Sequence, residues 1–196
     1  MEKSFITNQI SSSLKVKENI LNDKSLIEQI SNCCDLAIQT YQKGNKTLIA
    51  GNGGSAADAQ HIAGEFVSRF YFDRPGLASI AITTDTSILT AIGNDYGYDK
   101  IFSRQIEANG KNGDLFIAIS TSGNSTNILL AIQRAKEMGI SVIGLTGASG
   151  GKMKELCDIC ICVPSSETPR IQESHILVGH IICAAVEDIL FSEYKK

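Results

Sequence analysis

Side chains suited to proton transfer are few in this sequence, and their spacing is informative. His61 and Glu65 are four positions apart in an alanine-rich segment, so a helix there places both on one face. His175 and His180 lie in the last long apolar segment, and spacing alone does not select between them. A carboxylate with an imidazole suits proton transfer next to a carbonyl, as aldose–ketose isomerisation requires, and the same groups can bind zinc. A hydrogen-bonded core histidine is the alternative for the last helix.

A glycine-rich turn precedes His61 and is predicted to bind an anion. The short apolar run 47–50 is typical of a buried parallel strand, and the glycines at 51, 53 and 54 cannot continue it. Ser55, with Asp58 three residues later, matches a capping box, so Ser55 is predicted to be the N-cap residue of the helix that follows. A strand, a glycine turn and a helix N-terminus in this order present free N–H groups and a helix dipole to an anion.

A second polar turn follows the apolar run 114–119. Hydroxyl and amide side chains surround its glycine, Gly123: they belong to Ser120, Thr121, Ser122, Asn124 and Ser125. Hydroxyls and backbone N–H groups at a helix N-terminus can hold a phosphate without a lysine or arginine. An ordinary helix cap and turn is the alternative, because serine and glycine populate turns for local reasons.

Nucleotide-binding motifs are incomplete in this chain. The turn at residues 51–54 lacks the third glycine of the dinucleotide spacing. Residues 147–152 are one residue short of a P-loop, and Met153 follows where serine or threonine is required. The sequence therefore favours a small phosphorylated metabolite over a nucleotide.

Helical periodicity and short apolar runs alternate along the chain. Helices are expected over residues 3–21, 23–41, 86–92, 100–108, 126–138 and 168–194, the last capped by Thr168. Another helix is expected to follow Ser55, carry Glu65 and end before the break at 74–76, and a short one is expected after 151. Strands are expected at 47–50, 77–82, 114–119, 141–145 and 159–163. Residues 93–98 are expected to form a loop. This order predicts an α/β fold, a doubly wound five-stranded parallel sheet with two N-terminal helices added. The polar turns would share its carboxyl edge, where ligands bind.

Length, charge and cysteine use narrow the class of protein. The 196 residues fit one domain, and a net charge of −3 without a basic stripe argues against nucleic acid as a partner. We find no apolar signal segment and no run of transmembrane length, so no membrane partner is expected. The six cysteines are predicted to be free thiols, which fits a reducing cytoplasm.

Four motifs together resemble the bacterial phosphoheptose isomerases, which are sugar isomerase (SIS) domain proteins. They are GNGGSAADAQH at 51–61, GNDYG at 93–97, ISTSGNS at 119–125 and RIQE at 170–173. The resemblance covers nearly the whole chain. It implies a single SIS domain over 1–196, in which residues 1–44 form a helical extension packed on that domain and on neighbouring subunits.

The resemblance implies conversion of sedoheptulose 7-phosphate to D-glycero-D-manno-heptose 7-phosphate through an enediol. This is an early step toward nucleotide-activated heptose for lipopolysaccharide, capsule or glycoprotein. By family pattern, Glu65 and His180 are the catalytic acid–base pair, and one zinc ion per subunit is held by His61, Glu65, Gln172 and His180. The substrate-binding residues implied are Asn52, Gly53, Gly54, Ser55, Glu65, Asn94, Asp95, Ser120, Thr121, Ser122, Ser125 and Gln172.

The resemblance also implies a cytoplasmic homotetramer with active sites between subunits. Some family members carry an acidic residue just before the arginine of the RIQE motif, where this chain has Pro169, so no role for that acid is expected here. Two alternatives stay open: a non-catalytic SIS tetramer that binds the replication initiator, and another SIS sugar-phosphate enzyme such as an N-acetylmuramic acid 6-phosphate etherase. The joint presence of the four zinc-ligand residues favours the isomerase.

Overall fold

A computed structural model describes residues 2–195, and its centre is one parallel sheet. Within these residues five strands hydrogen-bond in the order β2-β1-β3-β4-β5. They are β1 (Thr47–Ala50), β2 (Ser79–Ala81), β3 (Leu115–Ile119), β4 (Ser141–Thr146) and β5 (Ile159–Cys162). Every residue of β1 and β3 is buried, as their continuous apolar runs predict for central parallel strands. The predicted doubly wound α/β fold is confirmed.

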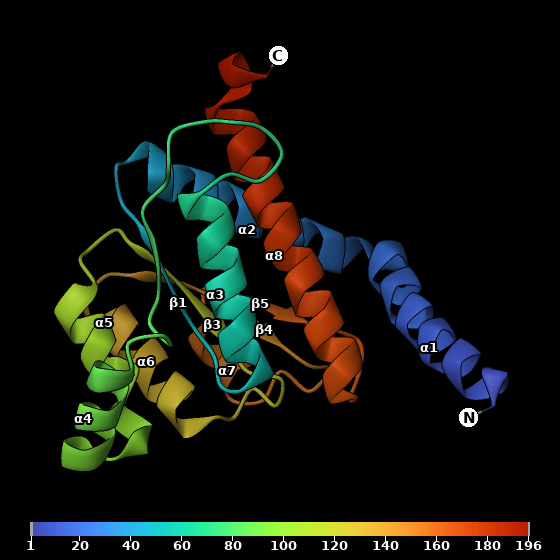
Figure 1. The fold of residues 1–196 in the computed structure, drawn as a ribbon, viewed down its shortest axis with the longest axis horizontal. Helices are drawn as coiled ribbons and strands as arrows, with labels where there is room; N and C mark the ends of the chain where they lie inside the picture. Colours follow the sequence, from blue (N-terminus) through green and yellow to red (C-terminus); the bar gives the residue numbers. More distant parts are fainter. Residues whose placement is uncertain (1, 196) are drawn as a thin grey trace.

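Helices cover both faces of the sheet (Figure 1). The α-helices are α1 (Lys3–Asn22), α2 (Lys24–Gln42), α3 (Gly54–Val67), α4 (Thr86–Tyr96), α5 (Ser103–Asn109), α6 (Thr126–Glu137), α7 (Met153–Leu156) and α8 (Thr168–Leu190). Short 3₁₀ turns lie at Tyr98–Lys100 and Ser192–Tyr194. One hydrophobic core joins α1, α2, α3 and α8 to the sheet, and a second core joins the other face to α5, α6 and α7. Alternate residues of β1 divide between them: Ile49 belongs to the first core and Leu48 to the second.

The strand order creates a switch point between β1 and β3. After β1 the chain moves outward through α3 to β2, and it then crosses to the opposite side of β1 to form β3. Ala50 pairs with Ala118 near the ends of these two strands, so the turns that follow them are neighbours. Ligands bind at such switch points in doubly wound sheets. The glycine turn (residues 51–54) and the serine turn (residues 120–125) therefore meet where a ligand is expected.

The two leading helices are placed very differently. Helix α2 packs along α8, and the Asp23 carboxylate caps it by accepting the N–H groups of Ser25 and Leu26. Helix α1 projects from the body of the molecule (Figure 1). In the described residues no helix combines the length and apolar character that a membrane crossing needs.

Three local predictions were wrong. Helix α3 has Gly53, not Ser55, as its N-cap residue, because the positive φ of Gly53 (55°) turns the chain into the helix two residues earlier. Helix α8 is preceded by Glu167, and no side chain caps it, so Thr168 is not its cap. The expected loop at 93–98 is helical up to Tyr96, because the helix stops only at Gly97, where φ is 87°.

Candidate active site

Helices α3 and α8 lie side by side and run in the same direction (Figure 1). The start of α3 meets the start of α8, since a side chain at Gly54 would lie 2.4 Å from the Gln172 amide nitrogen. Further along, a Cβ on Gly179 would lie 2.6 Å from Cδ1 of Ile62. The absence of that Cβ allows the close approach of the two helices. His61 precedes Ile62 and His180 follows Gly179, so this close approach brings the two histidines together.

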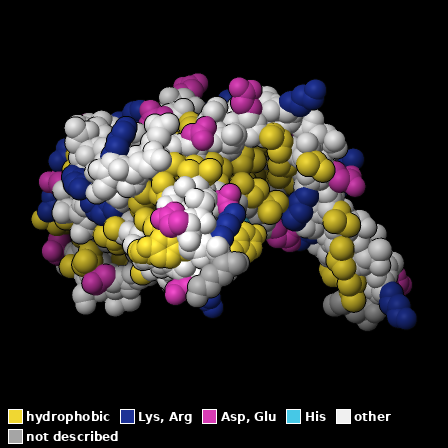
Figure 2. Space-filling view, turned by 90° about the horizontal axis from the view of Figure 1, so that it is seen from above, with side chains coloured by type: hydrophobic (Ala, Val, Ile, Leu, Met, Phe, Trp, Pro, Cys, Tyr) yellow, Lys and Arg dark blue, Asp and Glu magenta, His cyan; other side chains and the backbone are white. Residues whose placement is uncertain are grey.

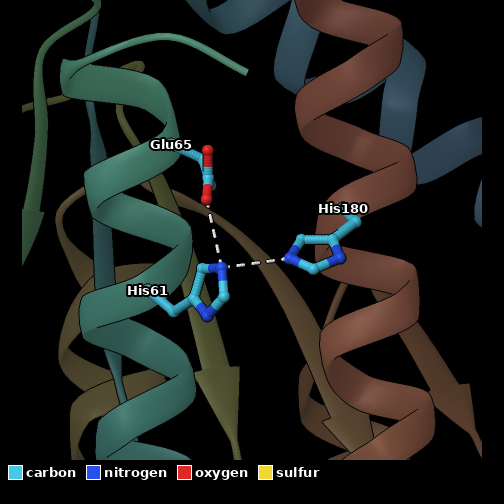
Figure 3. A group of neighbouring side chains, drawn as sticks. All are labelled: His61, Glu65 and His180. Atoms are coloured by element: carbon cyan, nitrogen blue, oxygen red, sulfur yellow. Dashed lines mark hydrogen bonds and ion pairs between the residues drawn. The ribbon is translucent and has the colours of Figure 1, made fainter. Parts of the chain in front are cut away.

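His61, Glu65 and His180 converge on one point between the helices (Figure 3). His61 Nε2 is 3.1 Å from Glu65 Oε1 and 3.1 Å from His180 Nε2. The Phe70 ring packs against the His180 imidazole, with centroids 5.4 Å apart. The side chain of His61 is 48% exposed and that of Glu65 is 26% exposed, so the group is open to a ligand.

The donor chemistry of this group fits a divalent cation. If His61 Nε2 carries a proton, it can donate to Glu65 or to His180 but not to both. If it carries none, its lone pair faces a carboxylate. A single cation would instead accept lone pairs from all three residues. Tetrahedral zinc with bonds of about 2.0–2.1 Å separates its ligand atoms by roughly 3.3 Å, close to the 3.1 Å found here.

The serine turn forms the second cluster. Ser120 is buried, and its hydroxyl lies 3.0 Å from that of Ser125 and 3.5 Å from that of Ser122. Ser125 is the N-cap residue of α6, yet its side chain makes no capping bond to the helix, so its hydroxyl bonds to Ser120 and can also face a ligand. These hydroxyls stand at a helix N-terminus, where N–H groups and the dipole favour an anion.

A third polar turn, residues 146–151, follows β4 and packs against the serine turn. Gly147 N–H donates to the Thr121 carbonyl and Met153 N–H donates to the Gly123 carbonyl. A Cβ on Gly123 would lie 2.2 Å from the Gly150 carbonyl oxygen, so the two turns are in direct contact. Its φ of 66° also requires glycine.

Asn52, a predicted substrate-binding residue, fastens the glycine turn to the serine turn through Asn127, which the sequence analysis missed. Asn52 and Asn127 exchange two amide hydrogen bonds, of 3.0 and 2.9 Å, and Tyr98 donates to the same Asn52 oxygen. Asn127 is 2% exposed and follows Ser125 in the first turn of α6. No spacing rule links positions this far apart in the chain, so the sequence carried no signal for this pair.

The remaining predicted residues are scattered around these clusters. Gly53 is exposed within the turn, and Ser55 is buried beneath it. Asn94 and Asp95 lie exposed on α4 and bond to each other. The Gln172 side chain lies next to Gly54. His180 is eight residues further along α8, which is about 12 Å along the helix axis. Within one chain, therefore, Gln172 is not beside the histidine–glutamate group.

The two histidines of α8 have opposite surroundings. His175 is fully buried, and one ring nitrogen, Nε2, is 3.1 Å from the Thr146 carbonyl oxygen. Burial lowers the pKa of His175 to about 4, although its bond to Thr146 acts in the other direction. His180 instead faces His61. The structure therefore selects His180 for the cluster and identifies His175 as a core histidine.

Known proteins match both the sequence and the fold. The SIS domain family matches residues 12–147. Phosphoheptose isomerase of Aneurinibacillus thermoaerophilus is 68% identical over 187 residues, which are 95% of this chain and 94% of that protein. The chain belongs to the phosphoheptose isomerase family of SIS-domain proteins.

Solved phosphoheptose isomerases share the whole architecture. The structure from Francisella tularensis superimposes with a TM-score of 0.91 at 35% identity, over 96% of this chain and 100% of that one. The structure from Neisseria gonorrhoeae superimposes with a TM-score of 0.89 at 42% identity, over 95% of this chain and 98% of that one. The expectation of an isomerase enzyme is confirmed, and the initiator-binding protein and the SIS lyase are not favoured.

Proposed function

We propose that this phosphoheptose isomerase family member interconverts sedoheptulose 7-phosphate and D-glycero-D-manno-heptose 7-phosphate. The observation that carries the proposal is the convergence of His61, Glu65 and His180 on one point between α3 and α8. An imidazole beside a carboxylate is suited to moving a proton between adjacent carbons of a sugar. The hydroxyl-lined turn at the β1/β3 switch point supplies a place for the phosphate.

The substrate's phosphate would bind to Ser120, Thr121, Ser122 and Ser125 at the N-terminus of α6. The glycine turn, with Asn52, Gly53, Gly54 and Ser55, would contact the sugar, together with Asn94, Asp95, Glu65 and Gln172. The amide of Asn52 is already bonded to Asn127 and Tyr98. The contribution of Asn52 to the sugar would therefore come chiefly from its backbone, held in place by that pair.

In the reaction, Glu65 and His180 would act as the acid–base pair. One group removes the proton from the hydroxyl-bearing carbon beside the carbonyl, while a proton is delivered to the carbonyl oxygen. The resulting enediol then receives the first proton on the neighbouring carbon and loses one from its other oxygen, which leaves the aldose. No net proton is gained or lost, so the same two groups return to their starting states.

We also propose that His61, Glu65 and His180 hold a zinc ion. When bound, zinc would supply Lewis-acid polarisation of substrate oxygens. The donor set and the 3.1 Å separations support this assignment. Because Gln172 lies at the other end of the helix pair, we propose that a Gln172 ligand would come from a neighbouring subunit.

A homotetramer with active sites between subunits fits these surfaces. About 16 Å of helix axis separate Gly54 from Glu65, so one chain holds its phosphate turn and its acid–base group well apart. Helix α1 carries an exposed apolar stripe, and an apolar groove of about 630 Å³ lies between α1, α2 and α8. Figure 2 shows hydrophobic side chains in a row along the projecting helix. Further copies of the chain would bury the α1 stripe and the groove, and would bring the phosphate turn of one subunit to the acid–base group of another.

The proposed setting is the cytoplasm, where the six free cysteines would stay reduced. The product would enter a route to nucleotide-activated heptose for lipopolysaccharide, capsule or glycoprotein.

The decisive experiment is an isomerase assay with sedoheptulose 7-phosphate, with Glu65→Gln as the matched variant. We expect the wild type to form the aldose and Glu65→Gln to lose at least 100-fold in kcat, because an amide cannot accept the carbon-bound proton. The variant should keep its circular dichroism spectrum and its affinity for inorganic phosphate. A wild type without turnover would refute the function, and a fully active variant would refute the role of Glu65.

A further inference from the structure

Glu187 is a buried carboxylate with no part in the chemistry proposed above. Its side chain is 1% exposed, as is that of its ion-pair partner, Arg74. It accepts the backbone N–H groups of Phe70, Tyr71 and Phe72 at 2.8, 2.6 and 3.2 Å, and Arg74 Nε donates to it at 3.1 Å. Four donors thus converge on one carboxylate inside the protein. Burial acts to raise its pKa, but these donors outweigh it and hold the pKa below the usual value.

Arg74 connects this carboxylate to the end of α3. Its Nη2 donates to the carbonyl of Glu65 at 2.8 Å, and its Nη1 donates to the carbonyl of Phe66 at 2.7 Å and to that of Ser68 at 3.2 Å. The last carbonyls of a helix lack partners within the helix. Arg74 therefore supplies partners for the turn of α3 that carries Glu65, and the Leu77 N–H supplies a further one for Phe66.

Glu187 also connects to His180. The two residues are seven positions apart on α8, so they lie on nearly the same face of the helix, the face toward α3. By holding the N–H of Phe70, Glu187 fixes the residue whose ring packs on the His180 imidazole. One buried ion pair thus reaches both members of the acid–base pair: Arg74 bonds directly to the Glu65 carbonyl, and Glu187 reaches His180 through Phe70.

We infer that Arg74 and Glu187 are positioning residues that set the distance between Glu65 and His180. The inference rests on the proposed function for its catalytic consequence. It goes beyond that function by assigning a role to two buried charges that touch neither the substrate nor the reacting atoms. A buried charge that loses its partner is costly, which makes the arrangement resistant to displacement.

The main test is Glu187→Gln, with Asp114→Asn as a matched control. Asp114 is also fully buried, and it accepts the N–H groups of Lys46 and Lys111 and a Lys46 ammonium bond. It lies just before β3, and its side-chain hydrogen bonds go to Lys46 and Lys111, which belong to neither α3 nor α8. Both variants replace one carboxylate oxygen with an amide that faces N–H donors, so both should lower the unfolding midpoint.

We expect Glu187→Gln to lower kcat at least tenfold with less than a threefold change in the KM for sedoheptulose 7-phosphate, because the phosphate turn is untouched. Its affinity for Zn²⁺ should fall at least tenfold. Asp114→Asn should keep kcat and Zn²⁺ affinity within twofold. Arg74→Lys retains the charge beside Glu187 but loses the two guanidinium bonds to the α3 carbonyls of Glu65 and Phe66. Its kcat and Zn²⁺ affinity should therefore lie between those of the two carboxylate variants. It replaces Glu187→Gln in the test if that variant does not fold.

A third measurement separates this inference from the proposed function. The chain has three histidines, so the ¹³C-histidine NMR signal of His180 can be assigned by substitution. The Phe70 ring should shift that signal, and Glu187→Gln should move it while Asp114→Asn should not. Wild-type protein inactive on the heptose phosphate would refute the function alone. An unmoved His180 signal, or equal loss of kcat in both carboxylate variants, would refute the positioning role.

Discussion

Two histidines of one helix differ here because of what surrounds each of them. His180 opens toward His61 and a ligand, whereas His175 is enclosed and bonded to the Thr146 carbonyl. The buried unprotonated imidazole of His175 links α8 to the end of β4. At this scale the protein places one histidine of α8 in the candidate site and the other in the core.

His175 should make stability depend on pH. Its pKa is about 4 in the folded protein against 6.5 for the free side chain, so between these values the unfolded chain binds a proton that the native state does not. The free energy of unfolding should therefore decrease as pH falls from 7 to 5, by roughly 2 kcal/mol from this group. Urea unfolding of wild type and His175→Gln at both pH values measures it. Equal pH dependence in the two proteins would contradict the prediction.

Ser120 tests the phosphate assignment. Ser120→Ala removes the hydroxyl that meets Ser125, so we expect the KM for the sugar phosphate to rise about tenfold, with a smaller loss of kcat because the phosphate also positions the sugar. Steady-state kinetics measures both constants. Ser103→Ala is the control, because that buried hydroxyl bonds only to the Lys100 carbonyl among the described residues. An unchanged KM in Ser120→Ala would remove the assignment.

At the scale of elements, the spacing of α3 and α8 decides whether the site exists. Gly179 and Ile62 are the closest approach in the middle of this pair, and the site residues flank it. The helices start together at Gly54 and Gln172 and are tied at their far end by Arg74 and Glu187. The two helices are therefore in contact along their length, with the proposed acid–base group at the middle.

Gly179→Ala should damage this unit. The new Cβ would lie 2.6 and 2.7 Å from two atoms of the fully buried Ile62, so we expect a loss of about 1–3 kcal/mol in stability and a clear fall in kcat. Thermal unfolding and the isomerase assay measure the two effects. The double variant Gly179→Ala/Ile62→Val should recover part of both, because it removes one clashing methyl group.

Gly64 is the matched control on α3. A Cβ there meets nothing within 4 Å, so Gly64→Ala should stabilise the helix by about 0.5–1 kcal/mol and leave kcat unchanged. If Gly179→Ala behaved like Gly64→Ala, the close approach of the helices would not matter for activity.

The whole molecule presents more apolar surface than one chain can cover. Phe5, Ile6, Ile10 and Leu14 are each more than half exposed on α1. An amphipathic helix that projects from the body needs a partner for its apolar face. This surface is the main support for an assembly of several copies.

Ile10→Glu should disrupt that assembly. A charge in the middle of the stripe opposes burial, so we expect species smaller than the wild-type oligomer in sedimentation velocity and at least a tenfold loss of turnover. Lys15→Glu is the control, because Lys15 is highly exposed and pairs with Glu18. A wild-type sedimentation profile with full activity in Ile10→Glu would show that the stripe is not an interface.

The sequence by itself determined the order of elements and the positions of the glycine turn and the serine turn. Apolar runs, helical periodicity and glycines act within a few residues, so β1, the glycine turn, β3 and the serine turn could be located without coordinates. The pairing of His61 with Glu65 is likewise a property of one helix. Even here a local rule failed at Ser55, because the freedom of Gly53 overrode the capping pattern.

The tertiary structure alone decided which side chains meet across elements. Selection of His180 over His175, the bonding of Asn52 to Asn127, and the ion pair of Arg74 with Glu187 all depend on how helices pack against each other and on the sheet. Spacing along one helix fixes a face but not the depth or rotation at which that helix meets its neighbour. The depth and rotation of each helix follow from the packing of the whole core, and they bring His61, Glu65 and His180 together.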